Sequence, residues 1–436
     1  MPSSRTARAA FAVAAIAGLA AAPLTACSTS GSGDGKVTIT FLTGSDVTNA
    51  TTAKDLIAGF QAQNPDITVK VDSQSGGSSA DNAVKTKLAT DTMDDVFYYN
   101  SGSLFQALNA DTKLVNLSDQ AWAGTLEADF KRVVSTSKGL YGAPLGTSLA
   151  GGVMYNRDVY KRLNLSVPKD WAEFLANSQK IKAAGITAVE QTFGDTWTSQ
   201  ILILADFANI TAQSAAWADD YTANKAKYAT QPALASFEHL ADLKKNGLLN
   251  ADFASAKNDA GLKAVAEGTA GHYPMLSSLI STVKQNSPDK IDNIGFFPLP
   301  ADNAADTRLT VWEPSALYIP RTTTGAKLDA AKKFVAFALS KEGCDIQNKD
   351  LTPSGPYVTS ACALPKDVPS LLNDMTPYFQ QKLTGPALEF LSPVKGPNLE
   401  NIAVQVGSGI SAAKDGAALY DDDVKKQAQQ LGLKGW

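Results

Sequence analysis

The sequence predicts an α/β protein divided into two lobes, and two observations support this prediction. Strand and helix patterns alternate over residues 37–99 in a βαβαβ order with about 30 residues per unit, which is typical of a parallel sheet covered by helices. The chain has 436 residues, of which 44% are hydrophobic, and this is more than one hydrophobic core usually organises. We therefore expect two α/β lobes rather than one large domain.

The first α/β unit follows from the spacing of its apolar residues. Ile67, Val69 and Val71 alternate as in a strand, whereas Leu56 and Phe60 recur at helical spacing. The Asn-Pro pair at 64–65 stops that helix. The predicted order is strand 37–41, helix 52–63, strand 67–71, helix 81–90 and strand 96–99.

A second α/β stretch begins near Pro144 and continues the alternation of strands and helices. Beyond residue 352 the chain is rich in proline and then helical to its end. The predicted strands are 153–155, 186–189, 270–275, 293–299 and 315–319, and the predicted helices are 171–184, 199–208, 233–246 and 328–340.

The N-terminus has the pattern of an export signal. Arg5 and Arg8 precede an apolar run at 9–22, which is shorter than the roughly 20 residues of a membrane span. The following Leu-Thr-Ala-Cys, ending at Cys27, resembles a bacterial lipobox. We predict a lipoprotein signal peptide at 1–26, lipidation of Cys27 and a flexible tether at 27–35. The protein would then sit on the extracellular face of a bacterial cell membrane, held by its lipid alone; an ordinary secreted protein is the alternative.

Composition excludes several classes of function. The 39 Lys and Arg residues against 43 Asp and Glu residues give a formal charge of −4, so there is no basic footprint for a nucleic acid. With only two histidines and three cysteines, a cluster of imidazole or thiolate ligands is not expected, and we predict neither a metal nor a cofactor.

Cys344 and Cys362 form an even pair in a chain predicted to be exported. Such pairs usually form disulfides, and a bond closing this short loop would stabilise the fold by about 3 kcal/mol. A metal or catalytic role is the weaker alternative, because neither cysteine has a His or Cys neighbour at ligand spacing.

A series of short motifs runs through the chain in a consistent order after the lipobox. The motifs are VTITFLTG (37–44), LIAGFQAQNPDITVKV (56–71), DDVFYYNSG (94–102), GAPLGTS (142–148), VMYNRDVYKRLNL (153–165), PKDWAEFL (168–175), AEGTAGHYPM (266–275), FFPLP (296–300) and YIPRTTTGAKLDAAKKFVAFALSKEG (318–343). Each motif alone is loose, but the series resembles the extracellular solute-binding proteins of family 1, the carbohydrate receptors of ABC importers.

This resemblance implies a periplasmic-binding-protein-like (Venus-flytrap) fold with discontinuous lobes and about three crossover segments. Lobe one would cover 36–143 and 304–345, and lobe two 146–300 and 350–436. The crossovers would lie near 144–145, near 298–300 and after Cys344. It also implies a monomer, without enzymatic activity, that closes its lobes on a di- or oligosaccharide and delivers it to the transmembrane permease of an ABC importer.

A sugar site needs carboxylates, amides and hydroxyls for the sugar hydroxyls, and flat aromatic rings for the apolar sugar faces. In parallel sheets ligands lie beyond the carboxyl ends of the strands, and the family uses the loops after its first and third strands. These two arguments select Asp46, Asn100 and Ser101, for which helix capping is the alternative. Thr147 and Ser148 follow the first predicted crossover, and Tyr357 is a further candidate for stacking on a sugar ring.

Two aromatic–acidic pairs complete the predicted site. Trp312 and Glu313 stand in a strand break just before Pro314, where the family usually has a glycine-rich ligand loop; packing between lobes is the alternative. Asp195 and Trp197 lie in the stretch that corresponds to acidic and aromatic ligand contacts in the family. Their alternative roles are a helix cap for Asp195 and a core residue for Trp197.

A rival hypothesis is a lipid-anchored extracellular glycoside hydrolase. Such an enzyme needs two carboxylates flanking a cleft, for which Asp195 and Glu313 would serve, and this pair leaves no local sequence signature. No H-E-x-x-H or G-x-S-x-G motif is present in the chain. An adhesion or purely structural lipoprotein fits poorly, because small polar residues occupy the loops at several strand ends.

Overall fold

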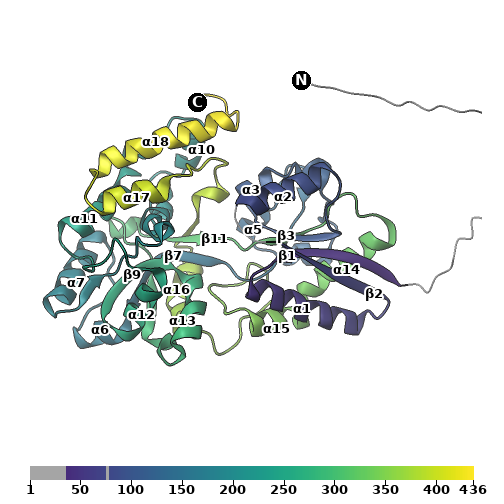
Figure 1. Cartoon of the computed structure of the whole chain (residues 1–436), viewed down its shortest axis with the longest axis horizontal. Coiled ribbons are helices and arrows are strands. Elements are labelled where there is room, and N and C mark those ends of the chain that lie inside the picture. The colour runs from purple at the N-terminus through teal and green to yellow at the C-terminus, as the bar shows by residue number, and fades with distance from the viewer. Residues whose placement is uncertain (1–35, 75–77) are drawn as a thin grey trace, which may run out of the picture. The chain divides into compact units, whose positions relative to one another are not determined.

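The computed structural model describes residues 36–74 and 78–436. The predicted signal peptide, tether and lipidated Cys27 lie outside the described residues. None of the helices that the structure describes is both long enough and apolar enough to cross a bilayer. Residues Val37–Trp436 form one unit that contains two separate main sheets with their covering helices (Figure 1). The predicted α/β class is therefore confirmed.

The first sheet combines the N-terminal strands with strands that return from later in the chain. Its order is β2-β1-β3-β12-β6, with β1 parallel to β2 and β3, and β12 antiparallel to β3 and β6. The ring of Phe334 on α14 lies 5.3 Å from the rings of both Phe41 and Phe60, which is why a helix from late in the sequence covers the N-terminal sheet. The strands are β1 (Val37–Gly44), β2 (Ile67–Gln74), β3 (Val96–Tyr99), β6 (Ala143–Pro144) and β12 (Ala316–Tyr318), beside the hairpin β4 (Ser135–Thr136) and β5 (Gly139–Leu140); the helices are α1 (Val47–Gln63), α2 (Ser78–Ala89), α3 (Ser103–Gln106), α4 (Ala110–Lys113), α5 (Ala128–Val133), α14 (Gly325–Ala338) and α15 (Lys341–Asp350).

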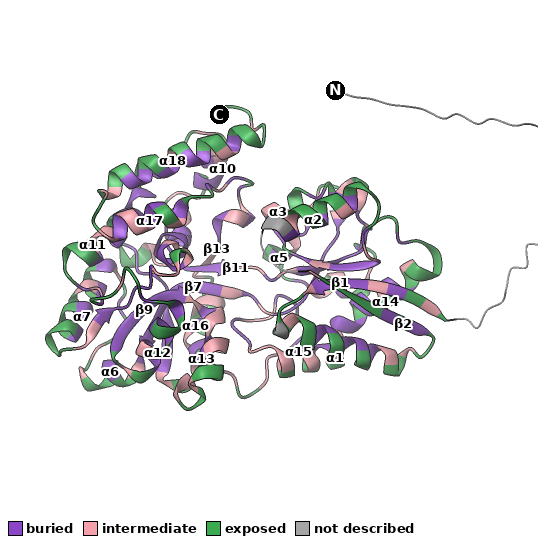
Figure 2. Cartoon of the chain, in the orientation of Figure 1, coloured by how far each residue is buried: buried purple, intermediate pink, exposed green. Residues whose placement is uncertain are grey.

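The second sheet is also mixed, and most of its strand pairs are antiparallel. Its central strand β7 is antiparallel to β9, β10 and β11, whereas β8 is parallel to β9 and β13 is parallel to β11. Most strands of the two sheets are largely buried, whereas the edge strand β2 and the outer sides of the helices are exposed (Figure 2). The strands are β7 (Leu149–Asn156), β8 (Thr187–Val189), β9 (Ala270–Leu276), β10 (Ile294–Phe297), β11 (Leu309–Trp312) and β13 (Thr384–Pro386); the helices are α6 (Arg157–Arg162), α7 (Trp171–Ala183), α8 (Ile201–Ala205), α9 (Phe207–Gln213), α10 (Trp217–Thr222), α11 (Leu234–Lys245), α12 (Asn258–Glu267), α13 (Ile280–Asn286), α16 (Ser370–Gln380), α17 (Leu399–Gly407) and α18 (Ala413–Gln430).

The chain enters the second sheet between Pro144 and Leu149 and returns to the first between Trp312 and Ala316. Residues 309–312, which were predicted to belong to lobe one, therefore lie in the second sheet. The proline-rich stretch at 298–300 does not lead back to the first sheet, since the chain continues from β10 to β11 of the second sheet. The amide of Asn209 on α9 bonds to both sides of the loop between them. Its Nδ2 donates to the carbonyl of Leu299 at 2.9 Å, and its Oδ1 accepts from the backbone N–H of Arg308 at 2.7 Å.

The predicted disulfide between Cys344 and Cys362 is present, with Cα atoms 5.4 Å apart. Cys344 lies on α15, and both cysteines are buried. The bond therefore attaches the segment that follows α15 to the helix itself.

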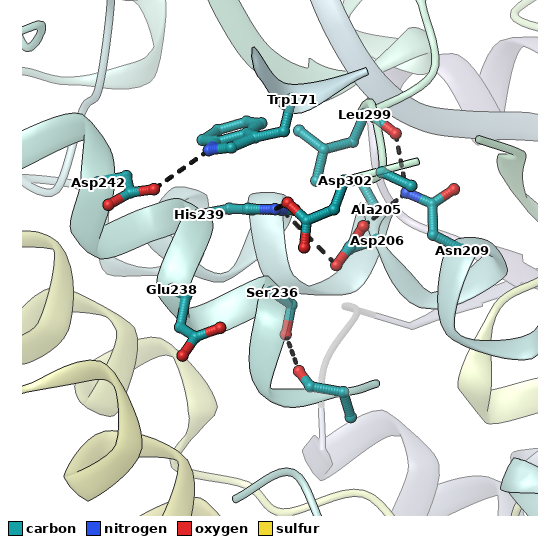
Figure 3. A network of polar contacts seen from close by, with 12 residues as sticks. Trp171, Ala205, Asp206, Asn209, Ser236, Glu238, His239, Asp242, Leu299 and Asp302 are labelled. Atoms are coloured by element: carbon teal, nitrogen blue, oxygen red, sulfur yellow. Dashed lines mark hydrogen bonds and ion pairs between the residues drawn. The ribbon is translucent and has the colours of Figure 1, made fainter. Parts of the chain in front are cut away.

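Both histidines are buried in the core around the second sheet. Burial lowers the pKa of His272 on β9 to about 3, and its Nε2 lies 2.6 Å from the hydroxyl of Tyr160. His239 on α11 stacks on Trp171, with ring centroids 4.1 Å apart. Its two ring nitrogens face Asp302 at 3.0 Å and Asp206 at 3.9 Å (Figure 3). These contacts connect α7, α11, the junction between α8 and α9, and the loop after β10, which is a structural role.

Candidate functional site

A cleft of about 1030 Å³ lies at the carboxyl ends of β3 and β11, beside the segment that connects β6 to β7. Its volume is near the upper end of the range for small-molecule sites, which is roughly 300–1000 Å³. The lining includes hydroxyl, amide, charged and aromatic side chains. Its aromatic rings are Tyr98, Trp312 and Phe390, its carboxylates are Glu313, Asp350 and Glu389, and its lysines are Lys284, Lys349 and Lys395.

Trp312 ends β11 and is the best-defined aromatic side chain of the cleft. It is half-buried and packs against the cores of both sheets. Its indole Nε1 donates to Oε1 of Glu389 at 2.7 Å, which fixes the ring orientation. Gly151 on the neighbouring β7 leaves room for the ring, because a Cβ at that position would lie 2.8 Å from Cζ3 of Trp312. The indole is therefore held in one pose by a hydrogen bond and by a close backbone approach.

Glu313 follows Trp312 in the cleft and makes no hydrogen bond with its carboxylate to any described residue. Its Oε2 is buried and unpartnered among the described residues. Burial first, and then the nearby charges of Asp129 and Glu127 against the opposing charge of Arg132, raise the pKa of Glu313 to about 7. The acid is therefore poised to gain a hydrogen-bond partner.

Two further cleft carboxylates have one oxygen in use and one without a partner. Oε1 of Glu389 accepts from Trp312, whereas its Oε2 is buried and unpartnered among the described residues. Asp350 ends α15, and its Oδ1 lies 3.6 Å from Lys349 Nζ. Its Oδ2 is likewise buried without a partner in the described part of the chain. Burial, followed by the charge of Asp55, raises the pKa of Asp350.

Three of the predicted polar contacts line the cleft together with Trp312 and Glu313, namely Asn100, Ser101 and Thr147. Ser101 donates its hydroxyl to the carbonyl of Pro314 at 2.9 Å, and the hydroxyl of Ser315 donates to Asn100 Oδ1 at 3.1 Å. These bonds attach the loop after β3 to the turn that carries Glu313. The rim argument from the sequence thus selected residues that do lie beside each other.

Asp46, Ser148 and Tyr357, also predicted as contacts, do not line the cleft. Asp46 caps α1, with its Oδ1 accepting from the N–H of Asn49 at 3.0 Å; this helix begins earlier than predicted because Asp46 caps it. Ser148 is buried and donates its hydroxyl to the carbonyl of Pro356 at 3.0 Å. The hydroxyl of Tyr357 donates to Asn348 Oδ1 at 3.0 Å.

Asp195 and Trp197 are also absent from the lining of the cleft. The carboxylate of Asp195 accepts from the N–H of Asn258, the first residue of α12, at 2.8 Å and from Lys257 Nζ at 3.1 Å. These two bonds, the backbone one first, lower the pKa of Asp195. Trp197 is half-buried against the core beside β9 and β10. Trp197 thus packs on the core, which was its alternative role, whereas Asp195 makes no side-chain cap on the turn that it begins and instead accepts from the first N–H of α12.

The cleft residues that sequence reasoning missed come mainly from the C-terminal third of the chain. Asp350, Glu389, Phe390 and Lys395 stand in segments without strand periodicity or a recognisable motif. Tyr98 lies within the predicted third strand but carried no separate signal. A search for groups of three or more His, Cys, Asp or Glu placed to hold a metal finds none among residues 36–74 and 78–436.

Comparison with known proteins identifies the family. Residues 44–343, more than half of the chain, match the bacterial extracellular solute-binding proteins. The chain belongs to this family. Its members are solute receptors of transporters, so the protein is a binding protein and not an enzyme.

Individual relatives agree with this assignment. The solute-binding protein is 28% identical over 335 residues to the multiple sugar-binding protein of Streptococcus mutans, covering 74% of this chain and 76% of the relative. The apo form of RafE from Streptococcus pneumoniae superposes with a TM-score of 0.74 at 20% identity, covering 92% and 99% of the two chains. A chitin oligosaccharide binding protein gives a TM-score of 0.73 at 19% identity, covering 90% and 99%. The predicted two-lobed binding-protein fold is confirmed.

Proposed function

We propose that this solute-binding protein binds a carbohydrate of two or more rings in the cleft and delivers it to the permease of an ABC importer. The relative from Streptococcus mutans is named a multiple sugar-binding protein, and structures with this fold include RafE in complex with raffinose and a chitin oligosaccharide binding protein. A cleft of about 1030 Å³ has room for more than one sugar ring.

The observation that carries this proposal is the combination of Trp312 with unpartnered carboxylate oxygens. An indole held by Glu389 offers a fixed flat face to the C–H side of a sugar ring. The buried oxygens of Glu313, Asp350 and Glu389 lack donors among the described residues, and sugar hydroxyls are donors. A neutral polyol would satisfy these acceptors without adding a charge.

The ligand contacts that we propose are five of the predicted residues and three that the structure adds. The five predicted residues are Asn100, Ser101, Thr147, Trp312 and Glu313, and the three added residues are Tyr98, Asp350 and Glu389. For the hydrolase hypothesis, the suggested pair of Asp195 and Glu313 is not available, because Asp195 is bonded to α12 and Lys257 outside the cleft.

We further propose that the receptor is a monomer held at the extracellular face of the membrane by a lipid on Cys27. The support is the Leu-Thr-Ala-Cys sequence at 24–27, followed by a Ser- and Gly-rich stretch before the first strand. Metabolic labelling with a fatty-acid analogue tests this part: label on the wild type and none on Cys27→Ser supports lipidation, and equal label on both contradicts it.

Calorimetry with purified protein tests the carbohydrate assignment. We expect binding of at least one of raffinose, stachyose and chitotriose with a Kd of about 1 μM or tighter, and weaker binding of the single-ring control galactose. Absence of binding to every sugar, together with binding to a peptide or a polyamine, would overturn the carbohydrate assignment. Chromatography of the recovered sugars must show them intact, because cleavage would support the hydrolase instead.

A further inference from the structure

The Cys344–Cys362 disulfide encloses one wall of the cleft. The two cysteines are 18 residues apart, and the segment between them carries Lys349, Asp350, Leu351, Thr352 and Ser354 of the cleft lining. Most of this segment beyond α15 has no regular secondary structure. Its position therefore depends on side-chain contacts and on the covalent link at its two ends.

The enclosed segment holds the connection between β6 and β7 at three successive residues. Gln347, which is buried, accepts the N–H of Gly146 with its Oε1 at 2.8 Å. The N–H of Ser354 donates to Oγ1 of Thr147 at 3.3 Å, and the N–H of Ser148 donates to the carbonyl of Pro356 at 3.0 Å. Each residue from 146 to 148 thus has a partner inside the disulfide loop.

The same segment contacts residues that belong to both halves of the binding unit. Ser277, just after β9 of the second sheet, donates its hydroxyl to the carbonyl of Ser354 at 2.6 Å. On the side of the first sheet, Lys349 pairs with Asp55 of α1 at 2.7 Å. The N–H of Ser360 donates to the carbonyl of Thr125 at 2.9 Å. The loop is therefore placed where the two halves of the binding unit meet.

We propose that the disulfide positions this wall for ligand binding, so that sugar affinity depends on the bond between Cys344 and Cys362. A disulfide reduces the conformations open to the segment it closes. If the wall is already ordered in the free protein, ligand binding does not have to include the entropic cost of ordering it, and the affinity is higher. With the bond absent, the contacts at Gly146, Thr147 and Ser148 remain possible but are no longer enforced, and sugar binding must order the wall.

The first experiment compares the sugar affinity of the wild type with that of the double variant Cys344→Ser/Cys362→Ser. It rests on the proposed function. With raffinose as the first probe, we expect the Kd to rise about tenfold. The matched control is Val406→Ala, which shortens a fully buried side chain of α17 in the core of the second sheet. We expect this control to lower the Tm and to leave the sugar Kd unchanged. A double variant with a lower Tm and an unchanged Kd would overturn the proposal, because the bond would then only stabilise the fold.

Hydrogen exchange provides a second arm that needs no ligand. We expect the amides of Gly146, Ser148 and Ser354 to exchange at least about tenfold faster in the double variant, while the amides of β3 keep their protection. Equal protection of these amides in the two proteins would overturn the proposal, whether or not a sugar binds. Absence of sugar binding to the wild type would contradict the proposed function instead. If the double variant does not fold, the folded wild type is reduced until two thiols per chain have appeared in addition to those of the oxidised protein, and the same amides are followed.

Discussion

Glu313 in the cleft and Asp195 beside α12 are acidic side chains in opposite surroundings. Asp195 accepts two hydrogen bonds, from the N–H of Asn258 and from Lys257, and these lower its pKa. Glu313 makes no hydrogen bond to any described residue, and burial raises its pKa to about 7. The same chemical group is satisfied in one region and left without a partner in the other.

The difference separates residues that maintain the fold from residues that await a ligand. A buried acceptor without a donor costs about 1–3 kcal/mol, so it persists in a folded protein mainly where a function requires it. The cleft contains such acceptors on Glu313, Asp350 and Glu389. The four predictions that follow test this separation, starting with the largest expected effect.

Replacement of Trp312 by alanine should have the largest effect on sugar binding. It removes the aromatic face and leaves Glu389 Oε1 without the indole donor, so we expect the Kd for the bound sugar to rise about 100-fold. The control is Trp197→Ala, which removes an indole outside the cleft and should change the Kd less than about twofold. Calorimetry measures both, and equal losses in the two variants would remove the distinction between the regions.

Replacement of Glu313 by glutamine should weaken binding and stabilise the free protein. Because the folded-state pKa of about 7 lies above the ordinary value of 4.5, the folded state binds more protons than the unfolded state between these values. Stability is therefore full below about pH 4.5 and decreases as the pH rises through 7.

The glutamine variant lacks this loss, so its free energy of unfolding should exceed that of the wild type by about 3 kcal/mol more at pH 8 than at pH 4. The loss of the carboxylate acceptor should raise the sugar Kd about fivefold. Urea titrations at both pH values measure the stability, and a wild type that is favoured at pH 8 would show that Glu313 has a partner in the folded state.

Replacement of Asp195 by asparagine should have the opposite pH signature. The lowered pKa of Asp195 means that its stabilisation is present above the ordinary value of 3.8 and is lost as the pH falls through the folded-state value. We expect the Tm to decrease by about 2 °C at pH 7, with the difference shrinking in acid. The sugar Kd should stay within about twofold. Thermal scans and calorimetry check this prediction, which a tenfold change in Kd would contradict.

Replacement of Asp46 by asparagine should have the smallest effect. Asparagine caps helices about as well as aspartate, and Asp46 acts as the cap of α1 outside the cleft lining. We expect both Tm and Kd to match the wild type within error. A clear loss of sugar affinity would instead place this side chain at the ligand.

Local sequence patterns were sufficient to predict part of this site. Trp312 and Glu313 were selected because an aromatic–acidic pair before Pro314 is unusual in a strand. Asn100 and Ser101 were selected because ligands bind beyond the ends of parallel strands and because the family uses the loop after its third strand. Each of these two patterns spans only a few consecutive residues. The fold class followed in the same way from the alternation of elements over the first α/β unit.

The remaining features depended on contacts between distant segments. Asp195 resembled the cap of its own turn, but it accepts from Asn258, which lies 63 positions further along the chain. Glu389 enters the cleft because it bonds to Trp312, 77 positions earlier, and no periodicity around it indicates this. The return of the chain to the first sheet was expected near 298–300 from the resemblance, but it follows β11, because that strand pairs with β7 and β13 of the second sheet.

The close approach of Trp312 to Gly151 has a consequence for how ligand preference can change in this lineage. A side chain larger than hydrogen at 151 would collide with the indole, so position 151 can accept one only after the ring at 312 becomes smaller. A smaller ring, in turn, leaves a void that position 151 could fill. The two positions, on adjacent antiparallel strands, should therefore change as a coupled pair, with the substitution at 312 coming before the one at 151.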